Sequence, residues 1–329
     1  MILFESDSAS AAFWFAAEEY IMRVLKPDET VLMMWSTDDT IMVGANQITE
    51  AECDPAYAIE AGIKIVRRSS GGGTIFTDRG TLQVTIILPF GPEDDNKTVI
   101  KERLAGPVIA ALARCGINAR LEGRNDLVIE GKKISGVAQY IKDGYICSHC
   151  SLLFRTDLDK LARSLTVDRT KYETKAIASV RSRVANISDF IAGQDLQIFL
   201  TALAETFGQG GDLHSRVFTE DELGDIENIM REKYRNPEWT FGHEPAFTFT
   251  NKKRFPGGQL EVYLDVKGGV IIGARIHGDF LSLLPVAELE SILRGVPHRK
   301  DALAEALDGI DVAGYLGLIV TTELLEVLL

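Results

Sequence analysis

Short apolar runs separated by turn residues dominate the first half of the chain. They predict strands at residues 30–34, 40–44, 63–67, 74–76, 82–88, 127–129, 133–141 and 145–154. Glu130-Gly131 and Asp143-Gly144 separate the last three runs, and connections this short require antiparallel neighbours. The pattern therefore argues against a doubly wound parallel sheet.

Apolar residues at helical spacing alternate with these strands. They predict helices at 97–115, 157–165, 188–207 and 219–234, and an N-terminal helix that begins near Asp7 or Ser8. Gly116 is a suitable end for the first of these. The helical pattern breaks at Arg235-Asn236-Pro237-Glu238, which predicts a large domain at 1–244 and a small one at 245–329.

The small domain has its own alternation of elements. Strands are predicted from about residue 246, then at 259–266 and 270–276 on either side of the hairpin signal Lys267-Gly268-Gly269. Helices are predicted at 286–293, 299–307 and 321–329. This order predicts a small α+β module.

Composition excludes several classes of protein. The 329 residues are 46% apolar and 25% charged, and the net charge of −13 argues against a nucleic-acid partner. No apolar run is long enough for a membrane span, and the N-terminus does not resemble a signal peptide. We expect a monomeric cytoplasmic protein with no membrane partner, and its four cysteines to be reduced.

The segment Cys147-Ser148-His149-Cys150 has the composition of a metal or redox motif. It lies on a predicted strand, so Cys147 and Cys150 should point to opposite faces. No second cysteine pair is present to complete a tetrahedral zinc site. The spacing therefore does not predict such a site.

Residues 67–76 contain the strongest chemical signal, Arg-Arg-Ser-Ser-Gly-Gly-Gly-Thr-Ile-Phe. Successive glycine amides can form an anion nest, and arginine adds charge-assisted hydrogen bonds to phosphate or carboxylate. The loop has neither the spacing of a P-loop nor that of a dinucleotide fold. A tight hairpin turn is the alternative, but the arginines favour an anion site, with Arg67, Arg68 and Arg79 available as a small basic patch.

A second constellation follows at Asn125-Asp126 and at residues 131–138, Gly-Lys-Lys-Ile-Ser-Gly-Val-Ala. Asp126 can hold a cation, and Lys133 lies on a strand among small residues that leave room for a ligand. Each segment alone is also compatible with an ordinary turn or a solvated hairpin. Their combination with the glycine loop favours a nucleotide site.

Together these motifs resemble the lipoate–protein ligase A family, which belongs to the biotin and lipoate ligase superfamily. The Arg-Arg-x-Ser-Gly-Gly-Gly loop, the Asn-Asp pair, the Gly-x-Lys-Ile-x-Gly-x-Ala element, His149 and the segment 179–186 occur in the family's order across about residues 10–240. The resemblance implies an α+β fold with a mixed, largely antiparallel sheet flanked by helices. It also identifies residues 245–329 as the family's accessory domain.

The resemblance implies an ATP-dependent ligase that converts free lipoate or octanoate to acyl-AMP with Mg²⁺. The acyl group then passes to a lysine of a lipoyl domain, on a dehydrogenase E2 subunit or the glycine cleavage H protein. Lys133 is the implied catalytic residue and Asp126 the implied Mg²⁺ ligand. The implied ATP and adenylate site consists of Arg68, Ser70, Gly72, Gly73, Thr74, Ile75, Phe76, Asn125, Asp126, Lys133, Gly136, Ala138, His149, Arg181 and Arg183.

The chain departs from the family at two places and leaves alternatives open. Thr77 and Thr81 replace the usual His and Asn after the glycines, and Cys150 replaces a usual Gly. Related transferases move octanoyl or lipoyl groups through a cysteine thioester without ATP, which makes Cys150 the feature to test. A non-catalytic lipoyl-domain binder is a further alternative. Biotin ligase is disfavoured because its Gly-Arg-Gly-Arg-type loop is absent.

Overall fold

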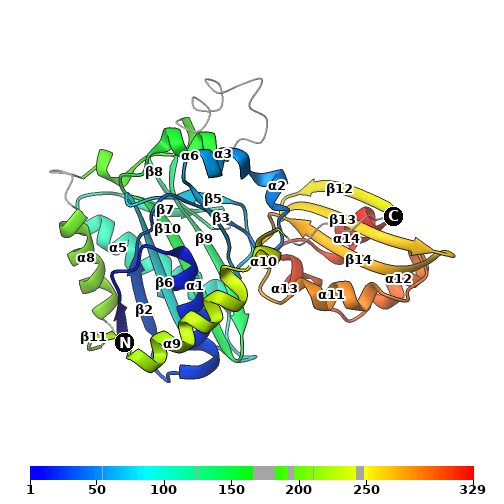
Figure 1. Cartoon of the computed structure of the whole chain (residues 1–329), viewed down its shortest axis with the longest axis horizontal. Helices are drawn as coiled ribbons and strands as arrows, with labels where there is room; N and C mark the ends of the chain where they lie inside the picture. Colours follow the sequence, from blue (N-terminus) through cyan, green and yellow to red (C-terminus); the bar gives the residue numbers. More distant parts are fainter. Residues whose placement is uncertain (54, 124, 166–181, 192–195, 210, 242–247) are drawn as a thin grey trace.

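A computed structural model describes residues 1–53, 55–123, 125–165, 182–191, 196–209, 211–241 and 248–329. The chain forms two bodies that lie side by side (Figure 1). The larger body contains the N-terminus, and the smaller one contains the C-terminus. The predicted boundary at 244/245 lies outside the described residues.

An eight-stranded mixed sheet is the centre of the larger body, as the resemblance implied. Its strand order is β11 (His214–Val217), β1 (Ile2–Glu5), β2 (Val31–Trp35), β6 (Thr81–Pro89), β10 (Tyr145–Leu153), β9 (Lys132–Lys142), β8 (Asp126–Ile129) and β7 (Ala119–Glu122). Only β11–β1 and β1–β2 are parallel, and the other pairs are antiparallel. The predicted antiparallel connections are therefore confirmed.

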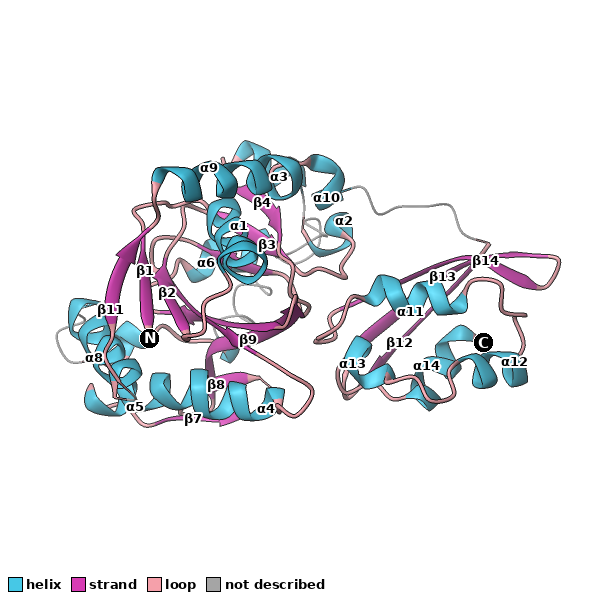
Figure 2. Cartoon of the chain, turned by 90° about the horizontal axis from the view of Figure 1, so that it is seen from below, coloured by secondary structure: helices cyan, strands magenta, loops and turns pink. Residues whose placement is uncertain are grey.

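Helices cover both faces of this sheet (Figure 2). The helices α1 (Ala11–Tyr20) and α9 (Glu220–Ile229) lie on one face, and α5 (Gly106–Arg114) and α8 (Leu196–Gly208) lie on the other. Strand β10 divides its side chains between the two cores, with Cys147 in the α1 core and Cys150 in the α5 core. The predicted opposite orientation of these two cysteines is confirmed.

A second, three-stranded sheet carries the glycine loop. It consists of β4 (Lys64–Arg67), β3 (Thr40–Val43) and β5 (Ile75–Thr77), with β3 in the middle. The short helices α2 (Thr49–Glu52), α3 (Pro55–Glu60), α6 (Leu158–Ser164) and α10 (Pro237–Phe241) lie beside it. The loop is thus the connection from β4 to β5, held at both ends by strand pairing.

The smaller body has the predicted α+β character. Strands β12 (Phe249–Phe255), β13 (Gly258–Lys267) and β14 (Val270–Gly278) form an antiparallel sheet. The predicted hairpin at Gly268-Gly269 is confirmed, and both glycines have positive φ. Helices α11 (Val286–Leu293), α12 (Lys300–Ala306), α13 (Val312–Leu316) and α14 (Thr321–Leu328) complete its core.

Three helix predictions needed correction. The N-terminal helix begins at Ala11, after Ser10, and follows an unpredicted strand, β1, from which residues 6–10 separate it. The predicted helix at 97–115 is continuous but composite: α4 (Asn96–Thr98), a π-helical segment η2 (Val99–Ala105) and α5. The prediction of one helix over 188–207 is wrong at its start. Ile187–Asp189 form only a 3-10 turn (η3), tied to the end of β10 by a hydrogen bond from Ser188 N to Phe154 O.

The predicted helix at 157–165 is confirmed as α6. The predicted helix at 219–234 is confirmed as α9 continued by a π-helical segment η4 (Met230–Tyr234). A third π-helical segment, η1 (Ile21–Leu25), continues α1. No described helix has the length and apolar character needed to cross a membrane.

Candidate functional site

The two adjacent arginines of the glycine loop point to different places, as neighbours at the end of a strand must. Arg67 is fully buried and donates hydrogen bonds to backbone oxygens, including Gly44 O at 2.8 Å, Gln47 O at 2.6 Å and Thr240 O at 2.8 Å. Trp239 returns a bond from its indole N–H to Arg67 O at 2.9 Å. Arg67 therefore ties the β3–α2 turn to α10 and does not face a ligand.

Arg68 shapes the loop itself. Its guanidinium donates to Met42 O, Gly71 O and Gly73 O at 2.8–2.9 Å, and its Nε donates to Ser70 Oγ at 3.1 Å. Burial and the adjacent Arg67 lower the pKa of Arg68 to about 10, so it stays charged at neutral pH. The charge thus lies directly behind the glycine amides, where it adds to their attraction for an anion.

The predicted three-arginine surface patch does not form. Arg67 and Arg68 are buried, whereas Arg79 is exposed and pairs with Asp38 at 2.9 Å. Each of the three guanidinium groups is bonded to acceptors within the protein. The charge closest to the glycine amides is that of Arg68, which lies beneath the loop and not on the surface.

Lys133 lies near the start of β9, where a bulge interrupts the pairing with β8. Its Nζ is 2.8 Å from Asp126 Oδ1, and a Cβ at Gly136 would lie 3.3 Å from the same ammonium. Asn125 Nδ2 donates to Val137 O at 2.8 Å and fastens the bulge. The bulge, the carboxylate and the missing side chain at Gly136 together fix where the amine lies.

These two constellations meet in one cavity of about 280 Å³. Most of the predicted site residues line it: Arg68, Gly72, Gly73, Thr74, Ile75, Phe76, Asn125, Lys133, Gly136, Ala138 and His149. The predicted convergence of the glycine loop and the lysine is therefore present in the structure.

Three predicted site residues do not line the cavity, and a fourth is not among the described residues. Ser70 is fully buried behind the loop, between Arg68 Nε and His149 Nε2. Asp126 lies beside the cavity as the ion-pair partner of Lys133. Arg183 is exposed and is not among the residues that line the cavity, and Arg181 lies outside the described residues.

The sequence indicated an apolar chamber near Val137, but not the residues that form its wall. The wall is formed by Phe15, Trp35, Met42, Val137, Leu153, Leu161, Leu165, Val184 and Leu281. These residues come from elements far apart in sequence, and their apolar character is shared with the rest of the core. Only the small residues around Val137 gave a sequence signal for a ligand chamber.

The C-terminal body contributes directly to this site. Gly72 N donates to Phe280 O at 2.9 Å, and Leu281 lines the cavity. Gly72 has a φ of +88°, and a Cβ there would lie 3.0 Å from Leu281 Cδ2. Asn46 adds two contacts, its O accepting from Gly278 N and its Nδ2 donating to Ser282 Oγ. The glycine loop is thus also the docking surface for the second body.

The departures at Thr77 and Thr81 do not alter the cavity wall. Thr77 Oγ1 lies 2.7 Å from Thr37 Oγ1, and Thr81 Oγ1 donates to Asp78 Oδ1 at 2.9 Å. Both threonines are buried, and neither lines the cavity. Thr81 completes a turn in which the Gly80 amide also donates to the Asp78 carboxylate, whereas Thr77 joins β5 to Thr37.

The departure at Cys150 lies on the far side of the sheet from His149. Its side chain is buried in the α5 core, and burial raises its pKa to about 12. A thiol in that environment is a poor source of thiolate. The structure gives no support to a thioester route through Cys150.

The comparisons with known proteins agree with this architecture. Residues 10–208 match the lipoyl protein ligase A/B catalytic domain, and residues 244–328 match the bacterial lipoate protein ligase C-terminus. The lipoate-protein ligase LplJ of Bacillus subtilis is 35% identical over 318 residues, which are 95% of each chain.

Two solved structures are similar to the larger body. A bipartite lipoate protein ligase of Thermoplasma acidophilum, described with its E2 lipoyl domain, is 28% identical with a TM-score of 0.67, over 75% of this chain and 98% of that one. A lipoate-protein ligase A bound with ATP is 26% identical with a TM-score of 0.64, over 73% and 98%. The mixed sheet and its glycine-loop cavity are therefore those of a lipoyl ligase catalytic domain. The chain belongs to the bacterial lipoate–protein ligase family.

Proposed function

We propose that this enzyme activates free lipoate, or octanoate, with ATP and transfers the acyl group to a lysine of a lipoyl domain. The observation that supports this most is the single cavity in which the glycine loop, Lys133 and a long apolar wall meet. A charged end beside an apolar chamber suits an amphipathic carboxylic acid joined to a nucleotide.

In the first step a carboxylate oxygen of the fatty acid bonds to the α-phosphorus of ATP, and the bond to pyrophosphate breaks. Catalysis of phosphoryl-group chemistry depends on positioning and on stabilising negative charge. The amides of Gly73 and Thr74 and the ammonium of Lys133 are the groups available for this. Arg68 supplies its charge from behind the loop and orients the glycine carbonyls away from the ligand.

Mg²⁺ fits the same site. It is usually held by one or two carboxylates together with substrate phosphates. Asp126 is the carboxylate beside Lys133, with about a third of its side chain exposed (38%). Mg²⁺ would neutralise phosphate charge when bound. Lys133 would then leave Asp126 for the nucleotide.

In the second step the ε-amine of the acceptor lysine bonds to the acyl carbon, AMP leaves with the electron pair of the mixed anhydride, and one amine proton passes to the departing phosphate. Lys133, at the junction of both groups, stabilises the developing oxyanion. The acceptors are lipoyl domains, such as those of dehydrogenase E2 subunits or the glycine cleavage H protein. The enzyme acts as a cytoplasmic monomer.

The proposal is tested by mass spectrometry of a lipoyl domain after incubation with the enzyme and lipoate, with and without ATP. A lipoyl mass gain only with ATP, accompanied by AMP, is expected. A gain from an acylated carrier protein without ATP would replace the ligase with a transferase. Binding of the lipoyl domain with no acyl-AMP formed would identify a non-catalytic binder.

A further inference from the structure

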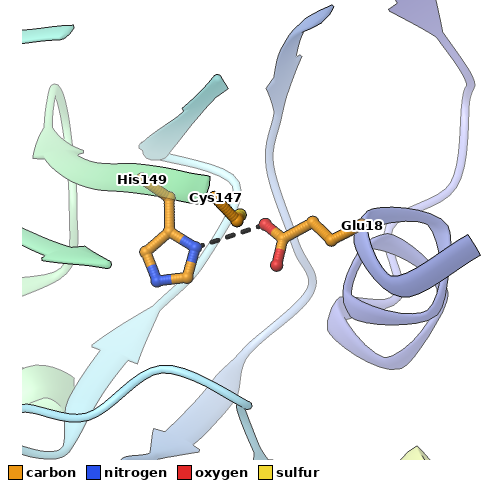
Figure 3. Close-up of side chains that lie close together, drawn as sticks. All are labelled: Glu18, Cys147 and His149. Carbon is orange, nitrogen blue, oxygen red and sulfur yellow. Dashed lines mark hydrogen bonds and ion pairs between the residues drawn. The ribbon is translucent and has the colours of Figure 1, made fainter. Parts of the chain in front are cut away.

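A buried cluster of three potential metal ligands, shown in Figure 3, adjoins the cavity through His149. Glu18 comes from α1, and Cys147 and His149 come from the same face of β10. One ligand atom from each lies within 4.8 Å of the other two. His149 Nδ1 and Glu18 Oε1 are 3.2 Å apart. It is the only such group of three in the described part of the chain.

We propose that Glu18, Cys147 and His149 form a binding site for Zn²⁺ or a similar thiophilic divalent cation. Sulfur, imidazole nitrogen and carboxylate oxygen are all ordinary zinc ligands. Bond lengths of about 2.0–2.3 Å in a tetrahedral site place ligand atoms roughly 3.3–3.6 Å apart. The His149–Glu18 separation of 3.2 Å is close to this range. The cysteine sulfur lies within 4.8 Å of the other two ligand atoms and would move closer to them when a metal binds.

The groups around the cluster orient its ligands. Ser70 Oγ lies 2.7 Å from Nε2 of His149, so the second ring nitrogen has a partner of its own and Nδ1 is directed at the cluster. Thr85 Oγ1 donates to Glu18 at 3.1 Å and fixes the carboxylate. Protein zinc ligands are commonly held by outer partners of this kind, which also raise the affinity for the metal.

Metal binding here is a simple exchange. The S–H bond of Cys147 breaks, a sulfur–metal bond forms, and the proton passes to solvent. The cluster is buried, so the neutral thiol is the resting form, and the cation supplies the charge that makes the thiolate favourable. Three protein ligands leave a tetrahedral ion with a fourth position for water or another ligand.

The location predicts what the metal does. His149 lines the cavity together with Trp35 and Met42, whereas Glu18 and Cys147 lie behind it. Because His149 belongs both to the cluster and to the cavity wall, an ion bound to it would fix this side chain, and we expect that to oppose binding of the acyl ligand. This consequence, unlike the metal site itself, rests on the proposed function.

Cobalt titration of the full-length protein tests the site without any activity measurement. Co²⁺ should produce a thiolate-to-cobalt charge-transfer absorption that Zn²⁺ abolishes by displacement. Cys147→Ala should remove the band and weaken Zn²⁺ binding by more than about 100-fold, beyond the loss typical of removing an outer partner. Cys150→Ala is the matched control, because it lies on the same strand, buried on the opposite face.

A band that survives in Cys147→Ala, or that disappears equally in Cys150→Ala, would overturn the site. Before the titrations, melting curves establish that both cysteine variants fold. The blocking role is tested by lipoate binding, followed by calorimetry, with and without Zn²⁺. Equal lipoate affinity with and without Zn²⁺ would reject the blocking role and leave the ligase assignment untouched. Failure of lipoate to bind the metal-free protein would instead count against the ligase assignment.

Discussion

Neutralising Glu19 tests how the catalytic body holds its glycine loop. Glu19 is 3% exposed and accepts bonds from Lys142, Lys233 and Tyr234 at 2.5, 2.8 and 3.0 Å. Lys233 and Tyr234 also reach Ser69, the residue next to Arg68. The carboxylate therefore connects α1 and β9 to the loop through η4. Glu19→Gln keeps the shape of the side chain and removes the charge.

The size of the effect follows from the pKa of Glu19. Burial alone would raise this pKa, but the fields and hydrogen bonds of Lys233 and Lys142 lower it from 4.5 to about 2. That difference corresponds to about 3 kcal/mol of folding stability. It is an upper figure, because burial lowers the pKa of Lys233 and so offsets part of the gain. The stabilisation is complete above pH 4.5 and is lost as the pH falls through 2.

Urea unfolding of the wild-type protein and of Glu19→Gln at several pH values measures this stabilisation. Glu19→Gln should lower the free energy of unfolding by about 3 kcal/mol at pH 7 and by only about 2 kcal/mol at pH 3.5. Adding Lys233→Met should cost less than the sum of the single changes, because it removes the unpaired ammonium. Glu29→Gln, at an exposed pair with the N-terminal amine, is the control and should have little effect. A loss that is identical at both pH values would refute the electrostatic explanation.

Three further predictions concern the site. Lys133→Ala should lower the rate of acyl-AMP formation and the rate of transfer from added acyl-AMP, each by on the order of 100-fold. Lys133→Arg should restore neither rate, since a planar guanidinium cannot replace a compact ammonium. An effect on only one of the two half-reactions would contradict the shared role of Lys133. Gly136→Ala should lower kcat while leaving the melting temperature nearly unchanged, because its Cβ would press on Lys133 Nζ from 3.3 Å; normal kcat would show that the amine has room to move. Cys150→Ser should retain ATP-dependent ligation, and loss of activity in a folded protein would revive the thioester route.

The sequence predicted the strands around the site because their signals are local. Apolar runs bounded by Asp-Gly or Glu-Gly identify β8, β9 and β10, and their short turns determine the antiparallel pairing. The ordered motifs then indicated which residues share the cavity. The strands β1, β7 and β11 were missed, since each has only four residues and carries little periodicity. For β1 and β11, the parallel pairing also depends on partners distant in sequence.

Side-chain roles were harder to predict than side-chain proximity. Arg67 and Arg68 are the same type of residue, and so are Ser69 and Ser70, so the sequence alone does not distinguish the roles within each pair. Strand alternation sends Arg67 toward α10 and Arg68 beneath the glycines, a distinction that requires knowing what packs on each face. The inclusion of Glu18 in the cluster behind His149 is likewise invisible in sequence, because 131 positions separate the two residues.

The most consequential unpredicted contact is between Gly72 and Phe280. The Gly72 N–H belongs to the loop that the proposed function assigns to phosphate, yet it donates to a carbonyl of the C-terminal body. One N–H cannot serve two strong acceptors at full strength. Leu281, next to Phe280, also occupies part of the cavity wall. While the C-terminal body is docked, the Gly72 amide is therefore engaged by Phe280, and the neighbouring amides of Gly73 and Thr74 are the ones left for phosphate.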